Sequence, residues 1–163
     1  MSAAPPSPPA ARFYDPAHLE PGESIGYLMR RVMSSMRNQI DARLSAHDLT
    51  YTQWWPLFRM AMCPQGTTLA TLARELESDP AAMTRVLDRL QAKGLIVRER
   101  STADRRVVHL SLTEAGQTTA ALVPPVLADV LNGHLSDFTH DEWQLLLRML
   151  QRMLANGEAL RQR

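Results

Sequence analysis

The chain has 163 residues, a length typical of one domain with short appendages. Its 18 Lys and Arg and 17 Asp and Glu give a net charge of only +1, which argues against a histone-like binder. The single cysteine, Cys63, excludes an internal disulfide and is typical of a reducing cytoplasm. No apolar run approaches the length of a transmembrane helix, and the first residues do not resemble a signal peptide, so we expect a cytoplasmic protein that does not contact a membrane.

The first 22 residues are rich in Ala, Pro and Ser and predict a disordered tail followed by an extended arm. Phe13 and Tyr14 give this arm an aromatic character. Such an arm either packs across a dimer partner or is a loose end, and the sequence leaves both open.

A long helix is expected from Ser24 to about His47, because apolar residues recur there at intervals of three and four. The next predicted helix runs from Gln53 to about Met62, with Thr52 as its cap and Pro56 in its first turn. This second helix is rich in aromatic residues and methionine. Residues of these types at helical spacing usually form core, and they can also line a pocket for a flat ligand.

Two shorter helices follow, joined by a tight turn. The first is expected over 69–77, and Asp79 and Pro80 then suit the cap and first position of a second helix that ends at Gly94. This arrangement is a helix-turn-helix, whose second helix would enter a DNA major groove. The alternative is a solvated amphipathic helix in an ordinary α-bundle.

The exposed face of the second helix carries small and polar side chains suited to DNA. Ala81 and Ala82 permit close approach, Thr84 can contact a base edge, and Arg85 can pair with guanine or phosphate. Arg89 lies on the same face. We therefore expect these five residues to bind DNA.

Strand-like runs at 95–97 and 107–112 flank a charged stretch and predict a β-hairpin, a wing beside the helix-turn-helix. We expect Arg106 to enter a minor groove, Asp104 to orient it, and Arg98 to bind that same carboxylate or a phosphate; Arg105 belongs to the same basic tip. The alternative is that these charges only protect a hairpin edge. Residues 85–106 contain seven Lys or Arg and three acids, so the positive charge is concentrated on this segment.

Thr113 is expected to cap a helix that runs to about Leu131, and Pro124–Pro125 in its middle should kink or split it. The last helix begins with a capping box, Thr139 to Glu142, and carries a wide apolar stripe. The fold class is therefore mainly α with a small β-hairpin wing: a winged helix-turn-helix DNA-binding lobe over 49–113, plus a helical dimerisation stem formed by 23–48 and 114–158.

The wing and the helix that follows it carry the pattern Asp104-Arg105-Arg106, then Leu112-Thr113-Glu114-Ala115-Gly116. This pattern, with Lys93-Gly94-Leu95-Ile96 at the end of the recognition helix, resembles the MarR (multiple antibiotic resistance regulator) family. The resemblance implies a homodimeric winged-helix regulator, usually a repressor, that binds a pseudo-palindromic operator in double-stranded DNA. It also implies release by a small aromatic carboxylate or phenolic effector, bound in a cleft between stem and lobe. The candidates for that cleft are Met33, Arg37, Trp55 and Arg59.

Other functions are less well supported by the sequence. No nucleotide-binding, hydrolase or metalloprotease motif is present, so we expect neither an enzyme nor a cofactor. A cluster of two His and two Asp at 134–141 lacks the spacing of a metal site, and we expect no metal. Cys63 is expected to be a buried, inert thiol. A DNA-binding regulator without a small-molecule ligand, or one that responds to metal or oxidation, remains the alternative.

Overall fold

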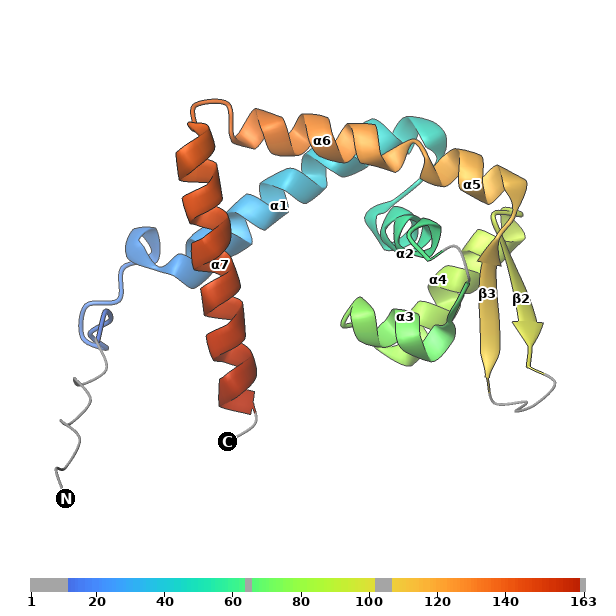
Figure 1. Cartoon of the computed structure of the whole chain (residues 1–163), viewed down its shortest axis with the longest axis horizontal. Helices are drawn as coiled ribbons and strands as arrows, with labels where there is room; N and C mark the ends of the chain where they lie inside the picture. Colours follow the sequence, from blue (N-terminus) through green and yellow to red (C-terminus); the bar gives the residue numbers. More distant parts are fainter. Residues whose placement is uncertain (1–11, 64–65, 102–106, 162–163) are drawn as a thin grey trace, which may run out of the picture. The chain divides into compact units, whose positions relative to one another are not determined.

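The computed structural model describes residues 12–63, 66–101 and 107–161. The chain divides into two compact units, residues 1–35 and 36–163, and each is described by itself. The division falls within helix α1, Ile25–Leu44, which contributes its first part to one unit and its last turns to the other (Figure 1).

The first unit consists of a short 3-10 helix, Pro21–Glu23, and the beginning of α1. The arm before it is tied to α1, because the Tyr14 hydroxyl oxygen accepts a hydrogen bond from the Ile25 amide at 2.9 Å. Five large apolar side chains on this part of α1 are exposed: Ile25, Leu28, Met29, Val32 and Met33. The apolar stripe that the sequence predicted is thus present and exposed.

The second unit continues from α1 through the 3-10 turn Ser45–His47 into α2, Tyr51–Ala61. The cap of α2 is Thr50, so the prediction of Thr52 was wrong by two residues. Thr50 forms a capping box with Gln53, whose side-chain oxygen accepts from the Thr50 amide at 3.3 Å. Because the helix begins earlier, Pro56 lies inside it and beyond its first turn.

The winged part follows as β1, Thr67–Thr68; α3, Leu69–Glu75; α4, Pro80–Ala92; β2, Ile96–Arg100; and β3, Val108–Leu112. The sheet has the order β1-β3-β2, with both pairs antiparallel. The sequence predicted the hairpin of β2 and β3. It did not predict β1, because two residues are too few to show an alternating pattern.

Three helices complete the unit: α5, Glu114–Ala120; α6, Val123–His134; and α7, His140–Arg161. The expected break near Pro124 and Pro125 is present as a full split between α5 and α6. The two prolines therefore lie in the first turn of α6, where a missing amide removes no helical hydrogen bond.

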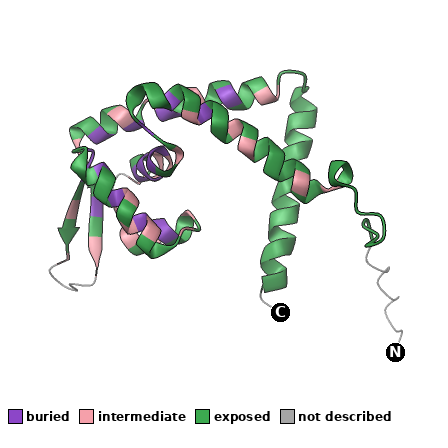
Figure 2. Cartoon of the chain, turned by 180° about the vertical axis from the view of Figure 1, so that it is seen from behind, coloured by how far each residue is buried: buried purple, intermediate pink, exposed green. Residues whose placement is uncertain are grey.

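The core lies between α2, α4, the sheet and α5 (Figure 2). Its fully buried side chains lie on α1, α2, α3, α4, β3 and α6 and in the segment before α2: Leu44, Leu49, Leu57, Leu72, Leu87, Leu90, Leu110, Val123 and Val130. By contrast, α7 has no buried residue along its 22 positions. The predicted fold class, mainly α with a small antiparallel wing, is confirmed.

Candidate nucleic-acid interface

Both helices of the helix-turn-helix are capped by local hydrogen bonds at their N-terminal ends. The Thr68 side chain caps α3 by accepting from the Thr71 amide at 3.1 Å, and Asp79 caps α4 by accepting from the Ala82 amide at 2.9 Å. Between the helices, Glu77 takes a left-handed conformation with φ of 47°, and the Ser78 amide bonds the Ala73 carbonyl. The turn is therefore fixed by the backbone and its caps.

The recognition helix α4 buries one face and presents the other. Met83, Leu87 and Leu90 are buried in the core. Arg85 and Arg89 are exposed one helical turn apart, and neither forms a hydrogen bond or ion pair with another described residue. Two guanidinium groups on one exposed face are suited to phosphate and base contacts.

The other residues of α4 that were predicted to contact DNA differ in their exposure and in their hydrogen bonds within the protein. Ala81 is exposed and Ala82 is half-buried at the start of the helix. The Thr84 hydroxyl donates to the Pro80 carbonyl at 2.9 Å, so it retains only its acceptor capacity toward a base.

Arg98 of β2 has partners on α4, whereas Asp104, the carboxylate that the sequence suggested for it, lies outside the described residues. Its guanidinium pairs with Asp88 of α4 at 2.8 Å and donates to the Thr84 carbonyl at 3.2 Å. The side chain is only 18% exposed, and in this structure it holds the wing against α4. No sequence pattern indicates this pair, because ten residues and a change of element separate its members.

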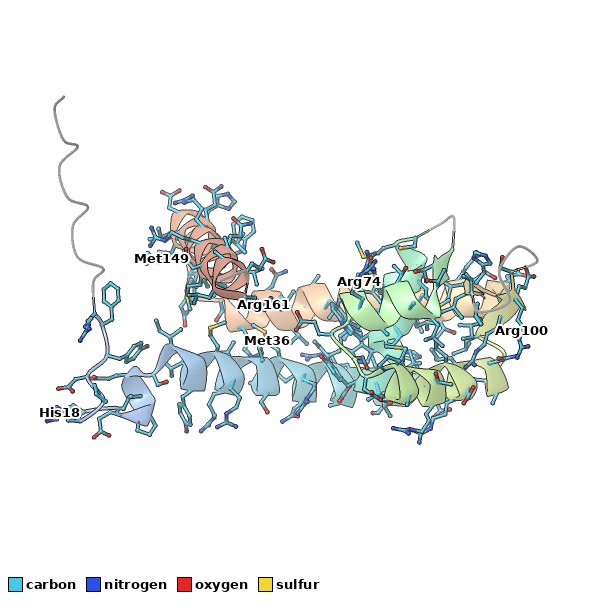
Figure 3. The ribbon with its side chains drawn as sticks, turned by 90° about the horizontal axis from the view of Figure 1, so that it is seen from below. His18, Met36, Arg74, Arg100, Met149 and Arg161 are labelled. Atoms are coloured by element: carbon cyan, nitrogen blue, oxygen red, sulfur yellow. The ribbon has the colours of Figure 1, made fainter. Side chains whose placement is uncertain are left out.

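The tip of the wing, residues 102–106, lies outside the described residues, and with it Asp104, Arg105 and Arg106. Strand β2 ends at Arg100, which is exposed (Figure 3). Its register pairs Arg98 with Leu110 and Arg100 with Val108.

Three of the four predicted ligand residues, Trp55, Arg59 and Arg37, lie in the second unit, where each contacts other protein side chains. Trp55 is half-buried and packs beside Trp54 and Phe58, at ring distances of 5.4 and 6.1 Å. Arg59 forms an ion pair with Glu75 of α3 at 3.0 Å, so a ligand carboxylate would have to compete with that pair.

The other two candidates lie on α1. Arg37 is exposed, with its guanidinium 5.4 Å from the centre of the Tyr51 ring, a cation–π contact. Met33 is 59% exposed and belongs to the first unit.

A cavity of about 610 Å³ lies elsewhere in the second unit, and none of the four candidates lines it. Its walls come from the end of α2, from β3 and from α5, and include Phe58, Met62, Leu110, Leu112, Gln117 and Ala121. The sequence did not indicate this position, because the cavity depends on how three distant segments pack.

Cys63 also borders this cavity and is half-buried, more accessible than the sequence suggested. Arg59 donates a hydrogen bond to its sulfur at 3.4 Å. Among residues 12–63, 66–101 and 107–161, no three His, Cys, Asp or Glu side chains are placed to hold a metal ion. Within the same ranges, no helix has both the length and the apolar character needed to cross a membrane.

These elements define a winged helix-turn-helix protein of the DNA-binding class. The MarR family model matches residues 49–108, which run from the start of α2 to the beginning of β3. The chain is also similar to solved structures. It is 28% identical to a MarR structure with a TM-score of 0.76, covering 88% of this chain and 97% of that one.

Two further structures agree with this assignment. A mutant MarR from E. coli in complex with operator DNA is 27% identical, with a TM-score of 0.72 over 80% of this chain and 93% of that one. A MarR family regulator from Silicibacter pomeroyi is 26% identical, with a TM-score of 0.75 over 88% and 96%. Residues 49–108 therefore carry a MarR-type domain, and the chain has the fold of MarR-family DNA-binding transcriptional regulators.

Proposed function

We propose that the protein is a repressor that binds a pseudo-palindromic operator as a homodimer and is released by a small aromatic carboxylate or phenol. The observation that carries the DNA-reading part is the exposed basic face of α4, where Arg85 and Arg89 are free of ion pairs with described residues. In this proposal Ala81, Ala82 and Thr84 contact the groove, and the basic wing tip with Asp104, Arg105 and Arg106 contacts its flank. Arg98 takes part by holding the wing.

The homodimer is proposed from the exposed apolar faces of α1 and α7. A two-fold axis relating two recognition helices would place them about 34 Å apart, one turn of DNA, and so favours a palindromic site. The similar E. coli MarR that was crystallised with operator DNA supports this type of target.

The effector is proposed on the family resemblance and on two residues of the second unit. Trp55 offers an aromatic ring and Arg37 an exposed guanidinium, which suit a flat anion. The second candidate function is a regulator without a small-molecule ligand. The ion pair between Arg59 and Glu75 favours it, because that cation already has a partner in the protein.

Fluorescence anisotropy with the protein's own upstream DNA tests the proposal, first at two salt concentrations and then with a panel of aromatic carboxylates and phenols. Specific, salt-sensitive binding that one compound reverses is the expected result. Specific binding that no compound in the panel reverses would contradict release by an aromatic acid and favour the second candidate.

The variant Arg85→Ala tests the role of α4 directly. We expect a loss of about 1–3 kcal/mol in operator binding, unequal between operator variants, because a guanidinium that reads a base discriminates between sequences. Arg43→Ala removes the same charge from α1 and is the control. A loss equal for all sequences would make Arg85 a phosphate contact, and no loss would remove α4 from the interface.

A further inference from the structure

Lys93 is the only lysine in a chain that otherwise uses arginine for its positive charge. It is the C-cap residue of α4, and the left-handed Gly94 after it turns the chain back toward β2. The Leu95 amide bonds the Leu90 carbonyl and the Gly94 amide bonds the Gln91 carbonyl, which closes the end of the helix. The lysine side chain therefore leaves α4 from a fixed position.

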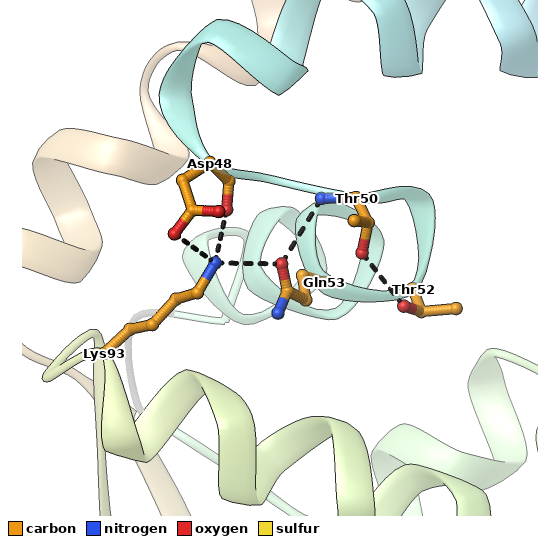
Figure 4. Close-up of polar contacts among 5 residues, drawn as sticks. All are labelled: Asp48, Thr50, Thr52, Gln53 and Lys93. Atoms are coloured by element: carbon orange, nitrogen blue, oxygen red, sulfur yellow. Dashed lines mark hydrogen bonds and ion pairs between the residues drawn. The ribbon is translucent and has the colours of Figure 1, made fainter.

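The Lys93 ammonium group meets three acceptors, one for each of its three N–H bonds (Figure 4). It pairs with the Asp48 carboxylate at 2.9 Å, donates to the backbone carbonyl of the same residue, and donates to the Gln53 side-chain oxygen at 3.2 Å. A compact ammonium satisfies acceptors that converge on one point, whereas a planar guanidinium does not.

The acceptors belong to the corner between α1 and α2. Asp48 has a left-handed backbone with φ of 54°, where few residues other than glycine, Asn and Asp are found. Gln53 is only 6% exposed, and its one side-chain oxygen serves both the Thr50 amide in the capping box and the Lys93 ammonium. The corner and the end of α4 are thus joined through shared groups.

The recognition helix is consequently held by charged contacts at two points. Arg98 of β2 holds its middle through Asp88, and Lys93 holds its C-terminal end against the α1–α2 corner. Among the ion pairs of the described residues, that of Lys93 is the one that joins the end of α4 to the α1–α2 corner.

We propose that Lys93 is a positioning residue: through Asp48 and Gln53, the α1–α2 corner sets the orientation in which α4 presents its arginines to DNA. The inference rests on the proposed role of α4 in reading the operator. It adds a residue that acts on DNA binding without touching DNA.

The competing role for Lys93 is a direct phosphate contact. A substitution of Asp48 distinguishes this role from the positioning role. Neutralising an acid normally strengthens DNA binding, because it removes repulsion from the phosphates. If Asp48 acts by holding Lys93, Asp48→Asn should instead weaken binding. Asn tolerates the left-handed backbone, so this change alters the charge and leaves the turn possible.

Operator affinity is measured for Lys93→Met, Asp48→Asn, the double variant and the control Asp129→Asn, an exposed acid on α6. We expect Lys93→Met to weaken binding roughly tenfold and Asp48→Asn by several-fold, with the double variant close to Lys93→Met alone. The slope of log affinity against log salt should stay at the wild-type value. Asp129→Asn should bind as well as the wild type or better.

The single lysine also gives a spectroscopic readout in the folded protein. Its side-chain ammonium signal in a ¹⁵N NMR spectrum should shift in Asp48→Asn and stay in place in Asp129→Asn. An unshifted signal would overturn the inference, as would Asp48→Asn binding DNA as tightly as Asp129→Asn. So would a salt slope reduced by about 0.9 in Lys93→Met, which is the loss of one phosphate contact.

If Arg85→Ala leaves binding unchanged, the proposed role of α4 itself fails. If Arg85→Ala weakens binding and Asp48→Asn does not, only the positioning role of Lys93 fails.

Discussion

Gly116 shows at the scale of one residue why the sequence after the wing has its pattern. The Thr113 hydroxyl caps α5 by accepting from the Gly116 amide at 2.9 Å and donates to the Gly94 carbonyl at 2.7 Å. The Thr113 amide also bonds the Leu95 carbonyl at 3.1 Å. These bonds draw α5 so close to the end of α4 that a Cβ atom at Gly116 would lie 1.9 Å from the Leu95 carbonyl oxygen.

We expect Gly116→Ala to lower the free energy of unfolding by about 1–3 kcal/mol, because the obstructing atom belongs to the backbone and cannot rotate away. Urea denaturation measures the change. Gly133→Ala on α6 is the matched control, since no atom lies within 4 Å of its Cβ position and alanine is the better helix former. A Gly116→Ala variant as stable as Gly133→Ala would show that α5 does not approach Leu95 in solution.

The start of α7 is an element whose cap depends on charge. The Glu142 carboxylate accepts from both the Thr139 amide and the Thr139 hydroxyl at 2.8 Å, and Thr139 accepts in turn from the Glu142 amide at 3.3 Å. The hydrogen bonds from the Thr139 amide and then its hydroxyl hold the pKa of Glu142 below its usual value of 4.5. The ionised form is therefore favoured in the folded helix.

It follows that this cap stabilises the protein at pH values above the ordinary pKa of a glutamate. The stabilisation is lost as the pH falls through the lowered pKa of Glu142 in the folded protein. We expect wild type and Glu142→Gln to differ in stability at neutral pH and to converge in the acid range below pH 4.5. Helical ellipticity during denaturation, measured at several pH values, checks this. Glu158→Gln, outside the first turn of the same helix, controls for net charge. A difference that is constant with pH would contradict the role of the ionised carboxylate.

The elements that the sequence predicted correctly are those fixed by local chemistry. Asp79 and Pro80 mark the start of α4 and Gly94 marks its end, and Thr139 with Glu142 marks the start of α7, because caps act over three or four residues.

The cap of α2 was misplaced because Thr50 and Thr52 are both capping residue types close to Gln53. The contact of Lys93 with Asp48 spans 45 residues, and no local pattern reports it. The cavity beside Phe58 was missed for the same reason. Of the residues expected at a ligand cleft, Arg59 pairs with Glu75 of α3, and Arg37 of α1 lies against the Tyr51 ring of α2.

At the scale of the whole molecule, the main observation is apolar surface without a partner. Six side chains along one face of α7 are exposed: Trp143, Leu146, Leu147, Leu150, Met153 and Leu154. Met149 on the same helix is exposed as well (Figure 3). The exposed stripe on the first part of α1 has the same character. Soluble proteins seldom leave such contiguous surface in water, so these faces are the place where a second copy of the chain would pack.

We therefore expect Leu150→Glu to dissociate the dimer, because it places a charge in the middle of the α7 stripe, where burial without a partner is costly. Sedimentation velocity should show the mass of one chain for this variant and the mass of two chains for the unmodified protein. Gln151→Glu adds the same charge about 100° around the helix and should leave the dimer intact. Since two half-sites are read together only by a dimer, Leu150→Glu should also bind the palindrome no better than it binds a single half-site. A Leu150→Glu protein that remains dimeric would place the interface on another face, and an unmodified protein that is monomeric would remove the dimer from the proposed function.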